Sequence, residues 1–204
     1  MTSVAFWDKV AEKYARDPIE DMAAYVETRE RMRARLKPSH RVLELGCGTG
    51  TTALELAGDV AHYHATDISG HMIDIAKRKH AAANLPHLHF SVAPAEGLPE
   101  GPHDVILALN LLHLVDDKHS VLRSIHGKLP AGGLFFAKTA VLKDGAWFLP
   151  WIIPAMRLIG KAPLVRSFSQ TDLVAAIEAA GFVIEDTYVQ PGTAPRVYTA
   201  ARKV

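Results

Sequence analysis

Two short stretches of the chain carry residue types suited to binding a nucleoside. Residues 42–50 read Val-Leu-Glu-Leu-Gly-Cys-Gly-Thr-Gly, an apolar strand pattern that runs into a turn with glycine at alternate positions. Gly46 permits a sharp exit from the strand, and Gly48 has no Cβ, so a ligand can touch the backbone there. After the next predicted strand, Asp67 offers a carboxylate that can accept both hydroxyls of a ribose. Together these positions predict a pocket for a nucleoside-bearing cofactor.

The spacing of the glycines separates two kinds of cofactor. The dinucleotide fingerprint is Gly-x-Gly-x-x-Gly, whose third glycine lets the helix close on the strand beside a pyrophosphate. Counted from Gly46, that third position is Thr51, and the chain has its glycines at 46, 48 and 50 instead. Glu44 stands two residues before the first glycine, where a carboxylate would repel a pyrophosphate but attract an ammonium group, directly or through water. The pattern therefore favours a nucleoside with a cationic tail.

His113 is the best candidate for a general base. It follows a predicted strand that ends near Asn110, and an ordinary histidine pKa of about 6.5 suits proton removal near neutral pH. The alternative is a loop histidine that helps to cap a helix expected from Asp116. Lys138 and Thr139 close another predicted strand, and we interpret both as a solvated strand end.

The eleven histidines of the chain raise the question of a metal site. His62 and His64 would share one face of a strand, as would His87 and His89. No acid or cysteine at ligand spacing completes either pair, so we predict no metal site. Cys47, in the glycine turn, is interpreted as a small space-filling residue rather than a nucleophile.

Alternating helices and strands must position these residues. Helices are expected where Phe6, Val10 and Tyr14 repeat, over about 20–36, after residue 50, from a cap at Ser69, from a cap at Asp116, and from a capping box formed by Ser169 and Asp172. Strands are expected over 41–45, 61–66, 87–92, 104–109, 134–138, 182–189 and 196–201. This alternation predicts an α/β fold, with a mostly parallel sheet covered by helices on both faces. In such sheets ligands bind outside the carboxyl ends of the strands, where strand order reverses.

Composition narrows the class of protein further. The 204 residues suit one α/β domain, and a net charge of +1 gives no electrostatic footprint for nucleic acid. A single cysteine excludes an internal disulfide and fits a reducing compartment. The N-terminus lacks the layout of a signal peptide, and the apolar stretch 146–160 is shorter than the ~20 residues that a membrane span needs. We therefore expect a soluble, cytoplasmic protein without stable membrane insertion.

Taken in order, the motifs resemble those of the class I S-adenosylmethionine-dependent methyltransferases, in particular the small-molecule type similar to the enzymes of ubiquinone and menaquinone biosynthesis. The likeness is carried by residues 44–50 with Asp67, and by residues 95–99, 103–106, 110–113, 122–133 and 179–182. It implies a Rossmann-like, doubly wound sheet of seven mostly parallel strands with an antiparallel last strand. It also implies S-adenosylmethionine as the methyl donor and S-adenosylhomocysteine as the product.

The resemblance further implies which residues bind the donor. The glycine turn would line its methionine part, Asp67 would hold the ribose, and residues after the second and third strands would flank the adenine. The implied cofactor-binding residues are Tyr14, Glu44, Gly46, Cys47, Gly48, Asp67, Ile68, Met72, Ala95, Glu96, Asn110 and Leu111. Pro94 is a departure, because members of the family often carry aspartate there. Either Glu96 or backbone groups would replace that contact to the adenine, and Glu96 as an ordinary surface acid is the alternative.

The acceptor is expected to be a small molecule rather than a nucleic acid. Residues 110–113 read Asn-Leu-Leu-His, which differs from the Asn/Asp-Pro-Pro-aromatic motif of methyltransferases that act on amide or exocyclic nitrogens. An apolar segment over 141–168, with Trp147 and Trp151, is expected to cover the substrate, and Trp7 and Tyr25 would add a second wall. A packed surface helix, a homodimer contact or a transient membrane-surface contact are the alternatives for this segment.

The single domain over 1–204 would thus comprise a helical lid (1–38), a cofactor-binding core (39–140), the apolar cover (141–168), and the last helix with the closing strands (169–204). Its expected function is the transfer of a methyl group from S-adenosylmethionine to a small hydrophobic or aromatic acceptor by in-line displacement. A dedicated base is optional, because positioning can supply ~7–11 kcal/mol of such a barrier. The alternatives are a non-catalytic protein that binds the donor or its product and, more distantly, a nicotinamide oxidoreductase.

Overall fold

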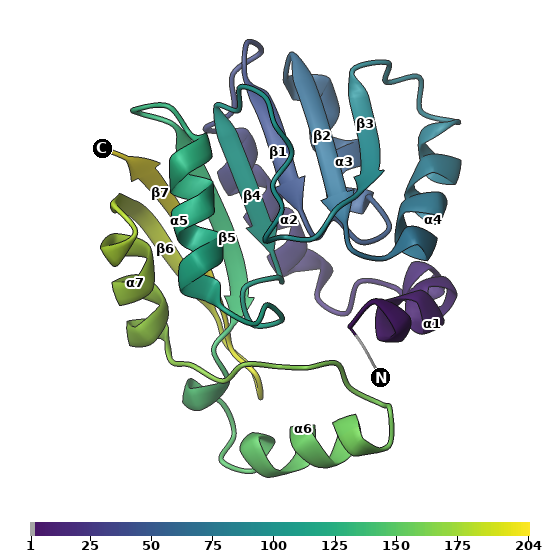
Figure 1. Cartoon of the computed structure of the whole chain (residues 1–204), viewed down its shortest axis with the longest axis vertical. Coiled ribbons are helices and arrows are strands. Elements are labelled where there is room, and N and C mark those ends of the chain that lie inside the picture. The colour runs from purple at the N-terminus through teal and green to yellow at the C-terminus, as the bar shows by residue number, and fades with distance from the viewer. Residues whose placement is uncertain (1–2) are drawn as a thin grey trace.

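The computed structural model describes residues 3–204 (for residue 150, the backbone only) and builds them around one twisted sheet (Figure 1). Its strands are β1 (Arg41–Leu45), β2 (His62–Asp67), β3 (Leu88–Val92), β4 (Val105–Leu109), β5 (Leu134–Ala140), β6 (Phe182–Gln190) and β7 (Arg196–Lys203). The strand order is β3-β2-β1-β4-β5-β7-β6. The first five strands are parallel, whereas β7 is antiparallel to both of its neighbours. This confirms the doubly wound seven-stranded sheet with an antiparallel last strand.

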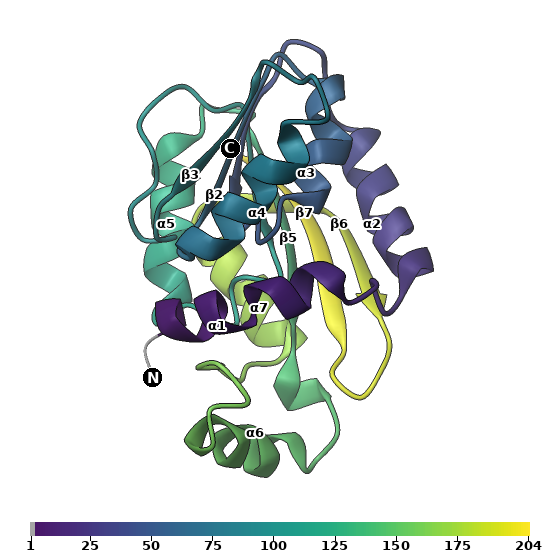
Figure 2. The same cartoon turned by 90° about the vertical axis from the view of Figure 1, so that its right-hand side faces the viewer.

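Helices cover both faces of this sheet (Figures 1 and 2). On one face lie α5 (Lys118–Lys128) and α7 (Gln170–Ala179), and on the other lie α2 (Met22–Arg33), α3 (Thr51–Leu56) and α4 (Gly70–His80). Consecutive residues of β5 show why both faces need a cover. Phe135 is buried in the apolar cluster with residues of α5 and α7, and Phe136 is buried in the cluster with residues of α2, α3 and α4. Because side chains alternate along a strand, a sheet buried on both faces reads as a continuous apolar run.

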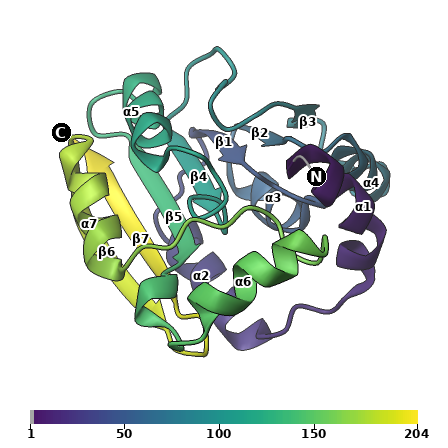
Figure 3. The same cartoon turned by 60° about the horizontal axis from the view of Figure 1, so that its bottom comes forward.

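The arrowheads of β1–β5 in Figure 1 point to one edge of the sheet, near which α1 (Ser3–Arg16) and α6 (Leu149–Leu158) lie. Figure 3 shows α6 passing in front of this edge. The helix α1 packs against α4, where Ala11 lies in one apolar cluster with Met72 and Ile75. Asp8 of α1 also accepts a hydrogen bond from Ser69 Oγ at 2.6 Å. The first helix is therefore attached beside the carboxyl end of β2.

Two of the predicted helix starts are confirmed and one is wrong by a residue. Ser69 accepts from the backbone of Met72, and Ser169 forms the expected capping box with Asp172. The cap of α5 is Asp117, whose carboxylate accepts from His119 N. Asp116, which we expected there, accepts instead from Arg166 Nη2 at 2.7 Å.

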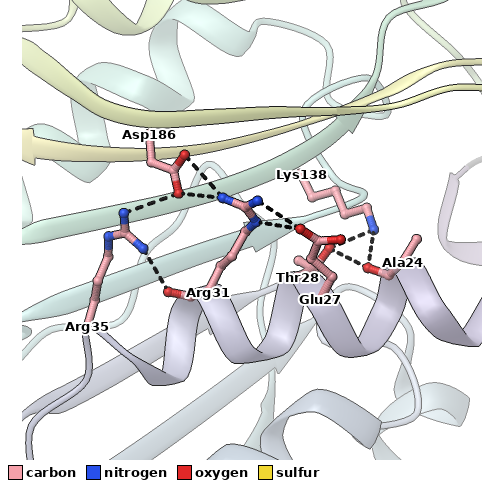
Figure 4. A network of polar contacts seen from close by, with 7 residues as sticks. All are labelled: Ala24, Glu27, Thr28, Arg31, Arg35, Lys138 and Asp186. Atoms are coloured by element: carbon pink, nitrogen blue, oxygen red, sulfur yellow. Dashed lines mark hydrogen bonds and ion pairs between the residues drawn. The ribbon is translucent and has the colours of Figure 1, made fainter.

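The polar helix α2 is attached to the sheet by charged side chains as much as by apolar ones. Its buried face is narrow and consists of Ala24, Thr28 and Met32, four residues apart. Beside it, Asp186 of β6 accepts from Arg31 and from Arg35, both at 3.1 Å (Figure 4). The β6–β7 register shifts between Ile184 and Asp186. Fixing α2 in this way fixes one wall of the cavity described below.

Replacing Gly50 by alanine should destabilise the fold more than the same change at Gly132, a glycine with a similar φ. Gly50 has φ +76°, and a Cβ there would lie 2.8 Å from the Phe90 ring and 2.9 Å from Ala76 Cβ. Gly132 has almost the same φ, +78°, and no neighbour within 4 Å. We expect Gly132→Ala to lower the free energy of unfolding by about 1–2 kcal/mol through backbone strain alone, and Gly50→Ala by about 2–4 kcal/mol because a steric clash adds to it. Urea unfolding followed by circular dichroism measures the free energy of unfolding of both variants. Equal losses of stability in the two variants would contradict this account.

Candidate functional site

A cavity of about 1070 Å³ opens at the carboxyl edge of the sheet. Residues from α1, from the glycine turn after β1, and from the ends of β2, β4, β5 and β7 line it. It brings together every residue that the resemblance assigned to the donor: Tyr14, Glu44, Gly46, Cys47, Gly48, Asp67, Ile68, Met72, Ala95, Glu96, Asn110 and Leu111. Trp7, Tyr25 and His113 line the same cavity.

The glycine turn presents its backbone to this cavity. Gly46 and Gly48 have φ values of +68° and +54°, a region that L side chains rarely adopt. A Cβ at Gly48 would meet only the ring of Tyr14 among the described residues, at 3.7 Å, so the space beside this backbone is open. A Cβ at Gly46 would lie 2.9 Å from Leu111 Cδ1, so the Leu111 side chain covers that residue. Gly48 is therefore the point of closest access to the backbone.

Backbone hydrogen bonds from Gly48 and Ser69 hold the Asp67 carboxylate in place. Its side chain is buried, with Oδ2 accepting from Gly48 N and Oδ1 from Ser69 N, each at 2.9 Å. Burial raises the pKa of this carboxyl, and the two backbone hydrogen bonds oppose that rise. A carboxylate has about four acceptor positions, so two remain after these bonds. Asp67 thus retains capacity for two further donors from the cavity.

Glu44 is the second acid of the cavity and the more deeply buried one, only 2% exposed. One of its oxygens accepts from the Tyr63 hydroxyl at 2.9 Å. Burial raises the pKa of Glu44 to about 7. A cation placed beside it would favour the charged form and lower that pKa.

Asn110 follows β4 in an unusual backbone conformation. Its φ is +54°, uncommon for a residue other than glycine, and its backbone N donates to Lys138 O at 2.5 Å. Such conformations persist where the surrounding structure imposes them, and they are frequent at functional sites. Leu111 and His113, the next lining residues, depend on this turn for their positions.

His113 faces the cavity from the loop between β4 and α5. Its Nδ1 lies 2.9 Å from Thr139 Oγ1, in a hydrogen bond with that hydroxyl. Burial lowers the pKa of His113 to about 4, so the imidazole is neutral at pH 7 and a weaker base than an ordinary histidine.

The interpretation of Lys138 and Thr139 as a solvated strand end is wrong. Lys138 is 8% exposed and Thr139 is fully buried, because β5 continues to Ala140. Lys138 Nζ donates to Thr28 Oγ1 at 2.9 Å and to Ala24 O at 3.5 Å (Figure 4). The apolar residues on both sides of these two positions were the available signal, because they make the strand pattern longer than we expected.

The aromatic residues near the N-terminus form one side of the cavity. Trp7 and Tyr14 meet edge to face, with ring centroids 6.4 Å apart. The Tyr25 hydroxyl donates to Glu55 Oε2 at 3.0 Å, and burial raises the pKa of Tyr25 to about 12. Burial also raises the pKa of Cys47 well above its ordinary value, so this thiol is protonated at neutral pH.

Trp147 and Trp151 are not among the residues that line the cavity. Both are strongly exposed, at 82% and 76%, on α6 and the turn before it. Pro163 and Val165, from the segment after α6, reach the cavity instead. The segment after α6 therefore borders the cavity, whereas the two tryptophans, expected to contact the substrate, are exposed outside it.

The described residues offer neither a cluster of metal ligands nor a membrane-spanning helix. Within residues 3–204, no group of three or more His, Cys, Asp or Glu side chains is placed to share a metal ion. None of the helices described here has the length and apolarity needed to cross a membrane.

Comparison with known proteins adds the family. A family model described as a methyltransferase domain matches residues 12–187. An uncharacterised methyltransferase of Mycobacterium bovis is 32% identical over 126 residues, which are 59% of this chain and 64% of that protein. A ubiquinone biosynthesis O-methyltransferase of Aeromonas salmonicida is 28% identical over 72% of this chain and 64% of its own length. A tRNA 5-carboxymethoxyuridine methyltransferase of Escherichia coli is 30% identical over 63% and 53%. The chain thus covers less than two thirds of the length of these relatives.

Solved structures share the fold at low sequence identity. A putative methyltransferase from Bacillus halodurans superposes with a TM-score of 0.75 at 14% identity, over 89% of this chain and 99% of that one. Magnesium protoporphyrin IX methyltransferase from Synechocystis, solved with S-adenosylhomocysteine bound, gives a TM-score of 0.74 at 15% identity, over 98% of both chains. Because the family model spans most of the sequence and the strand order is that of the Rossmann-like methyltransferases, this chain belongs to the methyltransferase domain family, in its class I, S-adenosylmethionine-dependent branch.

Proposed function

We propose that the chain moves a methyl group from S-adenosylmethionine to a small hydrophobic or aromatic acceptor by in-line displacement. One observation carries this proposal. Two buried carboxylates, Glu44 and Asp67, flank the open backbone of Gly48 in one cavity. They lie at the ends of the neighbouring strands β1 and β2, which suits a ligand with a cationic group beside Glu44 and a sugar diol beside Asp67.

The cavity residues fit the donor. Asp67 keeps two acceptor positions for the ribose hydroxyls, and Glu44 becomes fully charged beside an ammonium group. Ile68 and Met72 would flank the adenine, which lies toward β3 when the ribose is at the end of β2. With Pro94 unable to supply a carboxylate, the rim residue Glu96 is our candidate for the polar contact to the adenine.

The neighbouring strands then position the acceptor. When bound, S-adenosylmethionine supplies a methyl group carried on a sulfonium sulfur. As the methyl group bonds to the acceptor, its bond to sulfur breaks and the sulfur becomes a neutral thioether. The strand order β2-β1-β4-β5 continues the edge from the ribose, past the methionine part, to the ends of β4 and β5. His113 lies there and remains our candidate to accept a proton from the acceptor. Because its pKa is low, it suits an acceptor that is already acidic, and positioning supplies most of the rate.

The walls of this second part of the cavity favour a small apolar molecule. Leu114, Val115, Pro163 and Val165 line it. The volume of about 1070 Å³ is at the upper end of typical ligand sites, which suits a donor and an acceptor bound together. One relative is named for a tRNA substrate, but a net charge of +1 favours a small molecule for this chain.

Ligand-dependent melting and turnover test the proposed function. S-adenosylhomocysteine at 100 times its dissociation constant should stabilise the protein by about 2.7 kcal/mol, or roughly 5–10 °C in melting temperature. NAD at the same concentration should have no effect. A shift with NAD alone would contradict the proposal. Turnover of methyl-labelled donor with a panel of small aromatic and apolar acceptors then separates an enzyme from a non-catalytic donor-binding protein. Absence of turnover with every acceptor would favour the non-catalytic protein.

Asp67→Ala should weaken the binding of S-adenosylhomocysteine by about 1.5–3 kcal/mol for each charged hydrogen bond removed. Calorimetry measures the affinity, and Asp74→Ala is the matched control, because Asp74 is an exposed acid on α4 outside the cavity. Melting curves of both variants check the fold, since Asp67 also accepts from two backbone groups. Unchanged affinity in a folded Asp67→Ala protein would place the ribose elsewhere.

Binding of the donor should release protons through Glu44. With a pKa of about 7 in the free protein, about half of the Glu44 carboxyls are protonated at pH 7, and a bound ammonium group lowers that pKa. Affinity should therefore rise as the pH increases from 6 to 7.5, while up to about half a proton is released at pH 7. Calorimetry in phosphate and in Tris measures the release, which Glu44→Gln should abolish. Equal binding heats in the two buffers would place the ammonium group away from Glu44.

A further inference from the structure

Two cationic side chains line the end of the cavity farthest from the adenine side. Lys138 comes from β5 and Arg196 from the start of β7. In the antiparallel register Ala140 pairs with Arg196 and Lys138 pairs with Tyr198. Paired residues and those two positions apart share a face of the sheet, so Lys138 and Arg196 are diagonal neighbours on one face. Each is close enough to the cavity to be one of its lining residues.

In the described part of the chain, no carboxylate lies within ion-pair distance of either cation. Lys138 donates to the hydroxyl of Thr28 and the carbonyl of Ala24, both neutral groups (Figure 4). Among residues 3–204, neither Lys138 nor Arg196 forms an ion pair with an acid of the chain. Burial lowers the pKa of Lys138, and like-charge repulsion from Arg196 lowers it further. A buried ammonium with neutral partners and a second cation nearby is costly unless an anion joins them.

The two acids that act on Lys138 electrostatically, Asp21 and Glu27, hold hydrogen bonds to other groups. Asp21 accepts from Ala24 N at the start of α2 and from Gln190 Nε2, each at 2.9 Å. Glu27 accepts from Arg31, which in turn binds Asp186 (Figure 4). Both acids raise the pKa of Lys138 at a distance, but their hydrogen bonds hold them toward other partners.

The location separates these cations from the donor. The donor residues occupy the ends of β1 and β2 and the turn after β4, whereas Lys138 and Arg196 come from the next two strands, β5 and β7. The apolar wall residues Leu114 and Val165 and the imidazole of His113 line the same cavity. An acceptor with an apolar body would thus meet positive charge at its far end.

We propose that Lys138 and Arg196 form an anion subsite that binds a carboxylate of the methyl acceptor, so that the substrate is an aromatic or aliphatic carboxylic acid. The inference rests on the proposed function, because it assigns the acceptor half of the same cavity. The acid group would orient the apolar body toward the donor, and charged hydrogen bonds from an ammonium and a guanidinium are the strong kind.

The competing role for the two cations is to bind the carboxylate of the donor itself. The difference is measurable, because that role requires S-adenosylhomocysteine affinity to fall when the cations are removed. An acceptor subsite requires that affinity to stay the same.

The test compares matched acids and amides on the protein saturated with S-adenosylhomocysteine. The probes are benzoate against benzamide and phenylacetate against phenylacetamide, with binding measured by calorimetry or ligand-observed NMR. Wild-type protein should bind each acid at least about tenfold more tightly than its amide. Lys138→Met and Arg196→Met should each remove most of that preference while S-adenosylhomocysteine affinity changes less than about threefold. Lys143→Met is the control, since Lys143 pairs with Asp172 outside the cavity, and it should keep the preference.

Three results would overturn the subsite: equal binding of acids and amides by wild type, an unchanged preference in both variants, or a tenfold loss of S-adenosylhomocysteine affinity in them. Melting curves check the fold, which Lys138→Met should preserve because Thr28 Oγ1 also donates to Ala24 O at 2.7 Å. If S-adenosylhomocysteine does not bind wild type at all, the proposed function fails, and the acid–amide comparison on the protein alone still decides the subsite.

Discussion

The hydrogen bond from Gly48 N to Asp67 Oδ2 joins the ends of two neighbouring parallel strands, and the geometry of the cavity depends on it. Gly48 donates this bond while it has a φ of +54°, a conformation that glycine adopts without strain. The bond fixes the glycine turn and the Asp67 carboxylate relative to each other before any ligand arrives. Because these binding groups are already ordered, a ligand does not have to order them on binding, and the entropic cost of binding is lower.

Burial then divides the cavity into regions with different electrostatics. Low polarity around Glu44 and Asp67 raises the pKa of both carboxyls, whereas the same effect lowers the pKa of His113 and Lys138 on the other side. A partner of opposite charge would therefore favour the charged form of these groups: a cation near the acids and an anion near the lysine. In the proposed function, this edge of the sheet would carry two sites of opposite charge preference, separated by the end of β4.

The sequence predicted which residues line the β1–β2 side of the cavity far better than those that line its β5–β7 side. Glu44, Gly48 and Asp67 lie at strand ends whose position follows from local periodicity, so their convergence follows from parallel topology alone. Lys138 and Arg196 come together through the antiparallel pairing of β5 with β7, and no local pattern reveals that register. Lys138 was misinterpreted although the apolar residues beside it extend the strand pattern, because its burial also depends on α2, which lies more than a hundred residues earlier in the chain.

The short connection between β6 and β7, residues 191–195, has a consequence for how such a site can diversify. Side chains alternate along β7, so sliding that strand by one residue would turn Arg196 away and bring an uncharged neighbour, Pro195 or Val197, to its place. Turn type and loop length set the register of a hairpin, so a change in the length of this loop is a route to such a slide. The charge at the start of β7 would then change while β1, β2 and the glycine turn stay intact, and in the proposed function a small insertion or deletion there would alter which acceptor is bound.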